Sequence, residues 1–496
     1  MSKYRLVPGT PFEGEMSFPP PVGVVLNNTN SNTTIPPHKP VLCTGVLADG
    51  REDSWLEYIP EKLPKGKKPP LIISCHGGGA SAELQFNENS WWCVCEAEGT
   101  IAVFPNAGGQ AKAWLSDDPP AGGGPGGPGR PGGGLMDAFA GSADGRASEE
   151  NHHIKFIKAL IGEMKKKYDI DEGRVYMQGM SMGDIMTMMF SRVCGELLAA
   201  ADCTAGPSPE TALFNEDGSL KGYQCPVPMY QSRGELDNIV VAQRPGQETT
   251  TRQDVNAGNR EFWLKVNECC DLPRLAIRGV NNFAFYTGKK ANVVYRDVKH
   301  RGHGQTLDDS FWAWETLFKH CRRNPDGSVT CSDSDFTSTG DKNAVAICDG
   351  AQFAYVRNSK VKLEAPVFSE ALTNFDFATR KSVEIKRDLY VPVSALSQFF
   401  GAEVEISDDG LNALIRTDDE EYEVASESVA CLHGGFLEAM FMPAKVRNGV
   451  LYVALRWFAE VVFRRFVTEC DGALYFSGHY GEMSKDMAYL IRSILE

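Results

Sequence analysis

The chain has 496 residues, 42% of them hydrophobic, and a formal net charge of −15. This length allows two or three globular domains with sizeable cores, and the acidic balance disfavours nucleic acid as a partner. No run of eighteen apolar residues is present, because even 451–463 is interrupted by Arg456 and Glu460. We therefore expect no membrane-spanning segment and no membrane partner.

The amino terminus and the cysteines bear on the compartment. Residues 1–8 lack the apolar core of a secretory signal, so we expect a cytoplasmic protein or a processed form of a secreted one. No second CxxC and no histidine pair accompanies Cys93 and Cys95, or the adjacent Cys269 and Cys270. We expect no metal site. Buried free thiols are favoured over disulfides, and both readings stay open.

The first half of the chain has the pattern of an α/β fold. Residues 1–40 are rich in Pro, Asn and Thr without a hydrophobic period, which indicates an extended segment. Residues 41–47 and 53–59 flank a turn with a glycine and predict a β-hairpin. The apolar runs 71–75 and 101–104, with a helical segment between them, fit buried parallel strands. Strand, helix and strand in this order predict a doubly wound, mainly parallel sheet.

Two glycine-rich stretches lie in this part of the chain. His76-Gly-Gly-Gly79 follows the strand 71–75, and its glycines expose consecutive N–H groups of the kind that form one half of an oxyanion hole. A plain glycine-rich turn is the alternative. Residues 117–134 are a low-complexity Pro/Gly insertion, for which we expect a mobile surface segment or, alternatively, a lid beside a site.

A serine lies at the centre of the most informative stretch, 174–184. A short apolar strand runs into Gly179-Met-Ser181-Met-Gly183, and an apolar helix follows. Glycines two residues to either side of the serine suit a sharp strand-to-helix turn, because a side chain there would collide with the neighbouring backbone. We expect this turn to expose the Ser181 hydroxyl and to aim the first N–H groups of the helix at an oxyanion.

A carboxylate and a histidine follow later predicted strands. The strand 228–232 leads to Asp237, with Glu235 as the competing carboxylate, and the strand 291–295 leads to His303, with His300 closer to the strand. Flanking glycines give His303 the freedom to reach back over the sheet. Serine, acid and histidine then have the chain order of an α/β-hydrolase. We interpret His152 and His153, on the predicted helix 149–168, as surface or packing residues, not as catalysts.

Residues 41 to about 320 resemble the polyhydroxybutyrate depolymerase and feruloyl esterase group of α/β-hydrolases. The matching segments are 71–79, Trp114, 156–160, 168–176, the serine turn and 302–304. The resemblance implies that Ser181 is the nucleophile, Asp237 the orienting acid and His303 the base. It also implies an oxyanion hole from the N–H groups of Gly78 and Met182, substrate contacts by Trp114 and Gly77, and no cofactor.

The chain departs from this family at two places. Asp184 stands where the family often has a glycine, and the insertion 117–134 is unusual. A carboxylate so near the start of the helix is expected to alter pKa values or the polarity of the substrate that is accepted.

The carboxy-terminal part has an internal repeat. Residues 389–400 match 451–462 at an offset of 62, and Asp409-Gly410 matches Asp471-Gly472 at the same offset. We expect each copy to form strand, helix, strand, turn and strand, so that the tail is a small α+β domain. It resembles the copper amine oxidase N-terminal-like domain, although it lacks clustered copper ligands.

These patterns predict the domain order. We expect an extended segment at 1–40, a catalytic domain at 41–323, a polar linker at 324–343 and an accessory domain at 344–496. The apolar helices of the accessory domain, which carry Phe399, Phe400, Trp457 and Phe458, suggest that it packs on the catalytic domain.

The expected activity is that of a serine carboxylic-ester hydrolase that works through an acyl-enzyme. Small or polymeric esters are the expected substrates, of an aromatic feruloyl type or a polyester. A serine peptidase of the same fold is one alternative. A binding protein with a decayed hydrolase domain is the other.

Overall fold

The chain forms two compact units in the computed structural model. The first contains Met1–Cys270 and Phe285–Thr337, and the second contains Asp271–Ala284 and Ser338–Glu496. The insertion predicted at 117–134 and nearly all of the segment predicted at 1–40 lie outside the described residues. The structure describes residues 25–26, 31–32, 36–63, 65–108, 112–115, 148–237 and 251–496.

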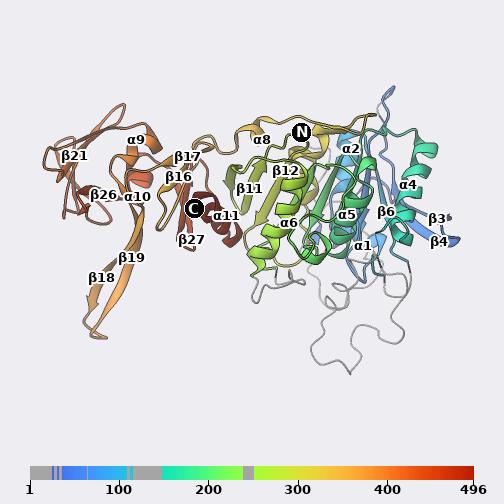
Figure 1. Ribbon diagram of the computed structural model, residues 1–496, viewed down its shortest axis with the longest axis horizontal. Helices are drawn as coiled ribbons and strands as arrows, with labels where there is room; N and C mark the ends of the chain where they lie inside the picture. The colour runs from blue at the N-terminus through green and yellow to red at the C-terminus, as the bar shows by residue number, and fades with distance from the viewer. Residues whose placement is uncertain are drawn as a thin grey trace. The chain divides into compact units, whose positions relative to one another are not determined.

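The first unit is built on a mixed, mainly parallel sheet (Figure 1). Eight strands of this sheet belong to the first unit, in the order β12-β9-β8-β7-β5-β6-β4-β3. Neighbouring strands from β12 to β6 are parallel, whereas β4 and β3 are antiparallel. The strands are β3 Val41–Ala48, β4 Arg51–Tyr58, β5 Leu71–Cys75, β6 Ile101–Pro105, β7 Val175–Met180, β8 Ala200–Thr204, β9 Met229–Gly234 and β12 Val293–Val298.

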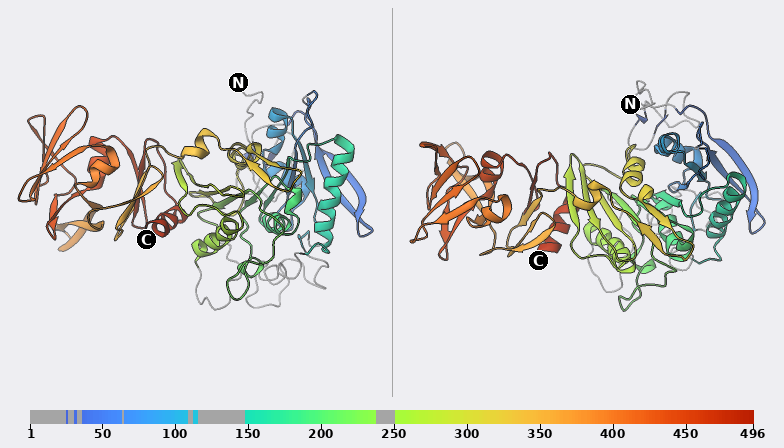
Figure 2. Two further views of the ribbon diagram at one scale, coloured as in Figure 1. Left: turned by 45° about the horizontal axis from the view of Figure 1, so that its top comes forward. Right: turned by 90° about the horizontal axis from the view of Figure 1, so that it is seen from above.

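Helices cover both faces of this sheet (Figure 2), which is why every residue of β5, β7, β8 and β9 is buried. Helices α1, α2 and α7 lie on one face, and α4, α5 and α6 lie on the other. Trp263 of α6 donates a hydrogen bond to the sulfur of Met188 in α5. The helices are α1 Ala82–Glu88, α2 Trp91–Glu98, α4 His152–Tyr168, α5 Met182–Val193, α6 Arg252–Val266 and α7 Asp309–Thr316.

The end of the first unit follows α7. A hairpin of β13 (Cys321–Arg323) and β14 (Val329–Cys331) comes next, and then the short helix α8 (Asp335–Thr339). Arg323 donates hydrogen bonds to the carbonyls of Leu198 and Gly195. The residues predicted as a polar linker, 324–343, therefore contain a strand and a helix.

The second unit contains three antiparallel sheets and short helices. Two sheets have five strands, in the orders β17-β16-β15-β28-β27 and β20-β21-β22-β23-β24, and the third has the order β18-β19-β26-β25. The hairpin β10–β11 (Arg274–Arg278 and Asn281–Tyr286) falls largely in this unit. The other strands are β15 Val345–Cys348, β16 Phe353–Val356, β17 Ser359–Lys362, β18 Phe368–Asp376, β19 Lys381–Pro392, β20 Glu403–Ile406, β21 Asn412–Arg416, β22 Glu421–Ala425, β23 Ala430–His433, β24 Phe436–Ala439, β25 Lys445–Arg447, β26 Val450–Ala454, β27 Phe466–Cys470 and β28 Ala473–Ser477.

The helices of the second unit are α9 Ala395–Phe400, α10 Leu455–Trp457 with the π-helix η4 Phe458–Val462, and α11 Lys485–Leu495. Phe399, Trp457 and Phe458 belong to the unit's own hydrophobic core, and Phe400 packs against it. Because these rings pack within the second unit, they no longer support the expectation that this unit packs on the first.

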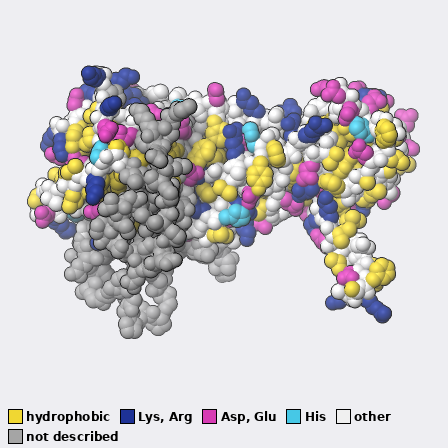
Figure 3. Space-filling view, turned by 180° about the vertical axis from the view of Figure 1, so that it is seen from behind, with side chains coloured by type: hydrophobic (Ala, Val, Ile, Leu, Met, Phe, Trp, Pro, Cys, Tyr) yellow, Lys and Arg dark blue, Asp and Glu magenta, His cyan; other side chains and the backbone are white. Residues whose placement is uncertain are grey.

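The hairpin β18–β19 extends from the rest of the second unit (Figures 1 and 3). Phe375 and Phe377 lie near its tip and are 47% and 86% exposed, and Val383 and Ile385 are also exposed. Four bases accompany them, at Arg380, Lys381, Lys386 and Arg387.

Candidate functional site

Ser181 occupies a strained turn between β7 and α5. Its φ of 58° and ψ of −115° place a non-glycine residue in a rarely populated region, which the surrounding structure must hold in place. A Cβ on Gly179 would lie 1.9 Å from the Gly183 carbonyl oxygen, and one on Gly183 would lie 2.1 Å from that of Cys75. Only glycines fit on both sides of the serine, as the spacing of the sequence predicts.

The structure brings Ser181, His303 and Asp237 together. Ser181 Oγ lies 2.9 Å from His303 Nε2, and His303 Nδ1 lies 3.0 Å from Asp237 Oδ2. Because a carboxylate accepts hydrogen bonds, Nδ1 carries the hydrogen and Nε2 is left to accept the serine proton. The Asp237 side chain is 5% exposed and that of His303 is 32% exposed, so the histidine faces solvent while the acid is buried behind it.

The loops that carry His303 and Asp237 are fastened to each other. The Leu236 N–H donates to the Arg301 carbonyl over 2.8 Å, and the His300 N–H donates to the Glu235 carboxylate. Glu235 also pairs with Lys299 at 3.0 Å. Glu235, the competing acid of the sequence, therefore joins the two loops, and the structure places Asp237 next to His303.

A buried aspartate anchors the histidine loop to α7. Asp309 accepts two hydrogen bonds of 2.9 Å from Arg301 and one of 2.7 Å from the Thr306 N–H. These two donors lie on either side of His303 in the chain, so a single carboxylate restrains both ends of its loop. Nothing in the sequence marks Asp309 for this role.

The glycine loop after β5 lies directly beside Ser181. A Cβ on Gly77 would lie 3.5 Å from Ser181 Cβ, and one on Gly78 would lie 2.5 Å from Met182 Sδ. Met182 is the first residue of α5, whose first N–H groups have no helical acceptor. The predicted oxyanion residues Gly78 and Met182 therefore lie next to each other at the serine.

His76 holds the start of this loop. Its Nδ1–H donates to the Gly77 carbonyl over 2.6 Å, and its Nε2 accepts the Ala107 N–H over 3.0 Å. Burial lowers the pKa of His76 to about 4, so the ring is neutral at neutral pH. Trp114 Nε1 donates to the His76 carbonyl over 2.8 Å and the ring is 2% exposed. Trp114 therefore lies behind the loop, and its contact with substrate stays a prediction.

A pocket of about 250 Å³ opens at Ser181. Within the described part of the chain it is lined by the loop 77–80, Leu84, Glu88, Met180, Ser181 and His303. Gly77, predicted to contact substrate, is among these residues. Glu88 was not singled out by the sequence, because a lone acid in a helix has no distinguishing pattern.

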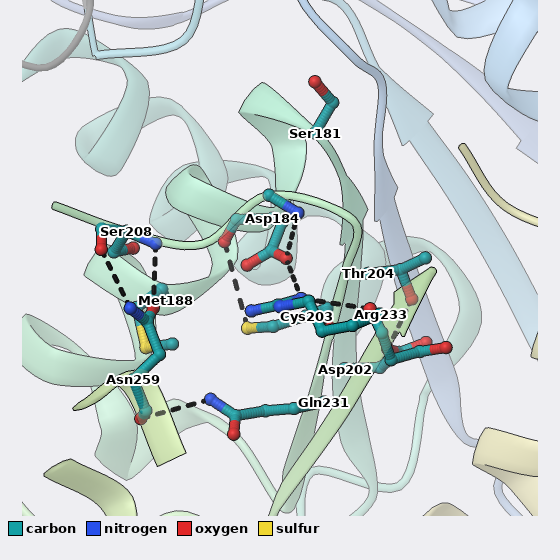
Figure 4. Close-up of polar contacts among 12 residues, drawn as sticks. Ser181, Asp184, Met188, Asp202, Cys203, Thr204, Ser208, Gln231, Arg233 and Asn259 are labelled. Carbon is teal, nitrogen blue, oxygen red and sulfur yellow. Dashed lines mark hydrogen bonds and ion pairs between the residues drawn. The ribbon is translucent and has the colours of Figure 1, made fainter. Parts of the chain in front are cut away.

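Asp184 lies beneath the serine turn, outside the pocket lining (Figure 4). Its Oδ2 accepts hydrogen bonds of 2.8 Å from Arg233 Nη1 and from the Gly206 N–H. Burial raises the pKa of Asp184 to about 6, and Arg233 opposes that rise. The Ser181 hydroxyl points away from this pair, so Asp184 braces the turn and does not set the polarity of the pocket as the sequence suggested.

His152 and His153 lie at the start of α4, away from the pocket lining. His152 Nε2 lies 3.0 Å from Asp53 Oδ1, and His153 Nδ1 accepts the Leu115 N–H over 3.0 Å. Burial lowers the pKa of His153 to about 3. In the residues that the structure describes, no group of three His, Cys, Asp or Glu side chains is placed to hold a metal ion.

Comparison with curated proteins finds esterases among the relatives. The chain is 26% identical over 188 residues to a bifunctional acetylxylan esterase/xylanase of Neocallimastix patriciarum, which covers 38% of this chain and 22% of that protein. It is 24% identical over 175 residues to feruloyl esterase B of Neurospora crassa, covering 34% of this chain and 51% of that one. The chain thus spans about half or less of the length of these relatives. No family model matches the chain.

Solved structures of esterases show a weaker likeness. An acetyl xylan esterase from Aspergillus awamori has a TM-score of 0.40 and 14% identity, covering 55% of this chain and 98% of that one. A poly(3-hydroxybutyrate) depolymerase from Bordetella parapertussis has a TM-score of 0.34 and 12% identity, covering 53% and 85%. Across the helices that the structure describes, none is long and apolar enough to span a membrane.

Proposed function

We propose that the first unit is a serine carboxylic-ester hydrolase in which Ser181 is the nucleophile, His303 the base and Asp237 the orienting acid. The observation that carries this proposal is the pair of contacts at His303, 2.9 Å to Ser181 and 3.0 Å to Asp237. The esterase relatives support the same reaction class. Aromatic feruloyl-type esters and polyesters are the proposed substrates.

In the first step, Ser181 Oγ attacks the ester carbonyl carbon while its proton moves to His303 Nε2. Asp237 holds the ring so that Nε2 faces the serine and stabilises the imidazolium that forms. The carbonyl oxygen becomes an oxyanion beside the N–H groups of Gly78 and Met182. When the tetrahedral intermediate collapses, His303 gives its proton to the departing alcohol, and the acyl group stays on Ser181.

The second step repeats this sequence with water. His303 Nε2 takes a proton from the water molecule as its oxygen attacks the acyl carbon. The oxyanion forms in the same place, and Ser181 Oγ leaves with the proton from His303. The carboxylic acid is released and the three side chains return to their starting protonation states.

A serine peptidase remains the alternative of the same fold. An amine leaving group needs firmer protonation by His303 than an alcohol does. Hydrolysis of p-nitrophenyl acetate, methyl ferulate and an aryl amide would separate the two classes. We expect turnover of the esters to exceed that of the amide by at least ~10²-fold, and the reverse order would contradict the ester proposal.

A binding protein with a decayed hydrolase domain is the alternative from another class. The 2.9 Å contact between Ser181 and His303 argues against it. A fluorophosphonate probe reacts only with an activated serine, so we expect it to label Ser181 in the wild-type protein. Wild-type protein that is neither labelled nor active on any ester would favour decay.

We also propose that residues 344–496 form an accessory α+β domain made of two copies of one repeat and similar to the copper amine oxidase N-terminal-like module. Strand registers support the repeat. In the first hairpin Glu405 lies opposite Leu414, and in the second Val467 lies opposite Phe476. Each partner in the second pair lies 62 positions after its counterpart in the first.

The two proposed copies meet at a local two-fold axis. Val391 of β19 lies opposite Val453 of β26, and these two residues are also 62 positions apart. Both are buried in the core of the second unit. Val391→Ala and Val453→Ala should therefore destabilise this unit by similar amounts, of roughly 1–3 kcal/mol. Unequal losses in denaturant unfolding would count against equivalent positions.

A further inference from the structure

Glu88 is one of the residues that line the pocket of Ser181 and His303. The residue is 2% exposed. The other lining groups that the structure describes are the loop 77–80, the apolar Leu84 and Met180, and the two reacting side chains. Among these described residues, Glu88 is thus the one with a carboxyl group, and no step of the proposed reaction uses it.

The position of Glu88 is fixed by the helix that carries it. Ser81 caps α1 by accepting the Leu84 N–H. Gln85 Nε2 donates to Ser74 Oγ over 2.9 Å and to Gln178 Oε1 over 3.1 Å, which ties the middle of the helix to β5 and β7. Glu88 lies one turn after Leu84, so both side chains project from the same face of α1. The carboxyl group is therefore held at the pocket by a rigid element.

Its chemistry restricts what fits the pocket. An ionised carboxylate only accepts hydrogen bonds, and it disfavours a second negative charge nearby. A pocket of this volume is roughly 8 Å across if it is taken as a sphere, at the small end of ligand sites. A hydroxyl or ammonium group of the substrate can therefore donate a hydrogen bond to Glu88, whereas a carboxylate at the same place would be repelled.

We propose that Glu88 is the specificity-determining residue of this site and selects esters that carry a hydroxyl or ammonium donor on the part held in the pocket. This inference rests on the proposed ester hydrolysis. Esters that carry a carboxylate there are rejected.

The test compares Glu88→Gln and Glu88→Leu with the wild type on matched esters. Methyl ferulate and methyl cinnamate differ in a donor on the acyl side, and acetylated xylose and ethyl acetate differ in donors on the alcohol side. Glu88→Leu should lower kcat/KM by about 10- to 100-fold on the donor ester of at least one pair. The readout is the ratio of kcat/KM within each pair, so that a general loss of activity in the variant divides out.

Glu88→Gln keeps an acceptor oxygen, so it should recover part of the loss on hydroxyl esters. Glu83→Gln, on the same helix but outside the pocket lining, is the matched control and should leave every ratio unchanged. Equal activity of both Glu88 variants and the wild type on all pairs would overturn the inference. A wild type that is inactive on every ester would instead refute the proposed function, and this inference with it.

The hairpin β13–β14 contains two cysteines that face each other. Cys321 and Cys331 lie directly opposite each other, and their sulfur atoms are 3.0 Å apart. The flanking pair is joined by a hydrogen bond from the Ser332 N–H to the His320 carbonyl. Hydrogen-bonded pairs alternate with open ones in such a ladder, so Cys321 and Cys331 form an open pair, in which side chains approach most closely.

We infer that Cys321 and Cys331 form a disulfide under oxidising conditions. The thiolate of Cys331 attacks one sulfur of a small disulfide such as oxidised glutathione, which releases one reduced thiol and leaves a mixed disulfide. The Cys321 thiolate then displaces the second thiol. Two protons leave the cysteines, and two electrons pass to the oxidant. The backbone geometry of an open pair lies in the range that disulfides require.

Equilibration with oxidised glutathione, followed by alkylation, proteolysis and non-reducing mass spectrometry, tests this inference. A linked pair of peptides should appear, and dithiothreitol should lower the Tm of the oxidised protein by roughly 5 °C. Cys331→Ser should lose this Tm response, whereas Cys43→Ser should keep it. Complete alkylation of both cysteines after oxidation, or an equal Tm response in Cys331→Ser, would overturn it.

Discussion

Two His–Asp pairs in the first unit have the same separation and different surroundings. His303 lies 3.0 Å from Asp237, and His152 lies 3.0 Å from Asp53. The second nitrogen of His303 faces Ser181 at 2.9 Å beside a pocket. The second nitrogen of His152 lies 3.4 Å from Asp49, and its side chain is 6% exposed. A His–Asp pair therefore indicates catalysis only where the free nitrogen meets a nucleophile and substrate has access to both.

The largest effect is expected when the nucleophile is removed. Of the two His–Asp pairs, only the pair of His303 and Asp237 lies beside a nucleophile. Ser181→Ala should lower esterase kcat by at least ~10³-fold, because it removes the oxygen that forms the acyl-enzyme. Ser191→Ala, in the same helix α5, is the matched control and should retain activity. Both are measured on p-nitrophenyl acetate with circular dichroism as the folding check. Near-normal turnover by Ser181→Ala would end the serine-hydrolase proposal.

The second test replaces each of the two histidines, His303 and His152, by alanine. His303→Ala should lower kcat by ~10³-fold or more without a change in Tm, because the ring is partly exposed and its role is proton transfer. His152→Ala should leave kcat within a few fold and lower the Tm, since it empties a buried site. His300→Ala should cost little activity. If His152→Ala or His300→Ala lost more activity than His303→Ala, the assignment of the base would be wrong.

Substitution of the acidic partners of the two histidines is expected to change kcat less. Asp237→Asn keeps the shape of the side chain but favours the wrong tautomer of His303, so kcat should fall by ~10²- to 10⁴-fold. Asp53→Asn should change stability more than kcat. Glu235→Gln weakens the link between the two loops, and we expect a loss of about tenfold or less. A larger loss in Glu235→Gln than in Asp237→Asn would make Glu235 the acid.

The buried histidine His153 is expected to make the stability of the protein depend on pH. Burial lowers the pKa of His153 to about 3, below the ordinary value near 6.5. The unfolded chain then binds a proton between these values that the folded chain does not, so stability falls as the pH drops below ~6.5. Between pH 7 and 5 this histidine should cost roughly 2 kcal/mol.

His153→Gln should therefore lose about 2 kcal/mol less than the wild type over that interval in denaturant unfolding. The wild type and His153→Gln must be compared with each other, because Asp184 changes the stability of both proteins in the opposite direction as the pH falls. Its pKa, raised to about 6 by burial, makes its contribution to stability rise as the pH falls from about 6 towards 4. A wild type and a His153→Gln protein with the same pH profile would contradict the buried neutral state of His153.

The sequence predicted the features that local physics controls. The buried strand at 71–75 was predicted with the bounds that β5 has, because a short apolar run before glycines has few other solutions. The turn at Ser181 was predicted from its two glycines for the same reason. Helix α6 begins at Arg252 after a capping box of Thr251 and Asp254, which is another local signal that the sequence carries.

Contacts between distant residues that belong to no recognised motif could not be predicted. Asp184 and Arg233 are 49 positions apart, and neither carries a local pattern that names the other. Asp184 was therefore expected to influence the substrate, whereas the structure places it under the turn. The same limit applies to Asp309 and Glu88, whose roles depend on which loops and helices lie next to them in the folded chain.

The strand order of the second unit has a consequence for how that unit tolerates cleavage. Within residues 338–496 the first strand, β15, pairs with the last, β28, and β21 pairs with β22 across the turn at 417–420. Each of the three sheets thus contains strands from both sides of that turn, and neither half has a complete sheet alone. A cut in the turn at 417–420, a type of site where proteases act readily, would leave two interlocked fragments. The same interlocking allows two copies of the chain to exchange halves.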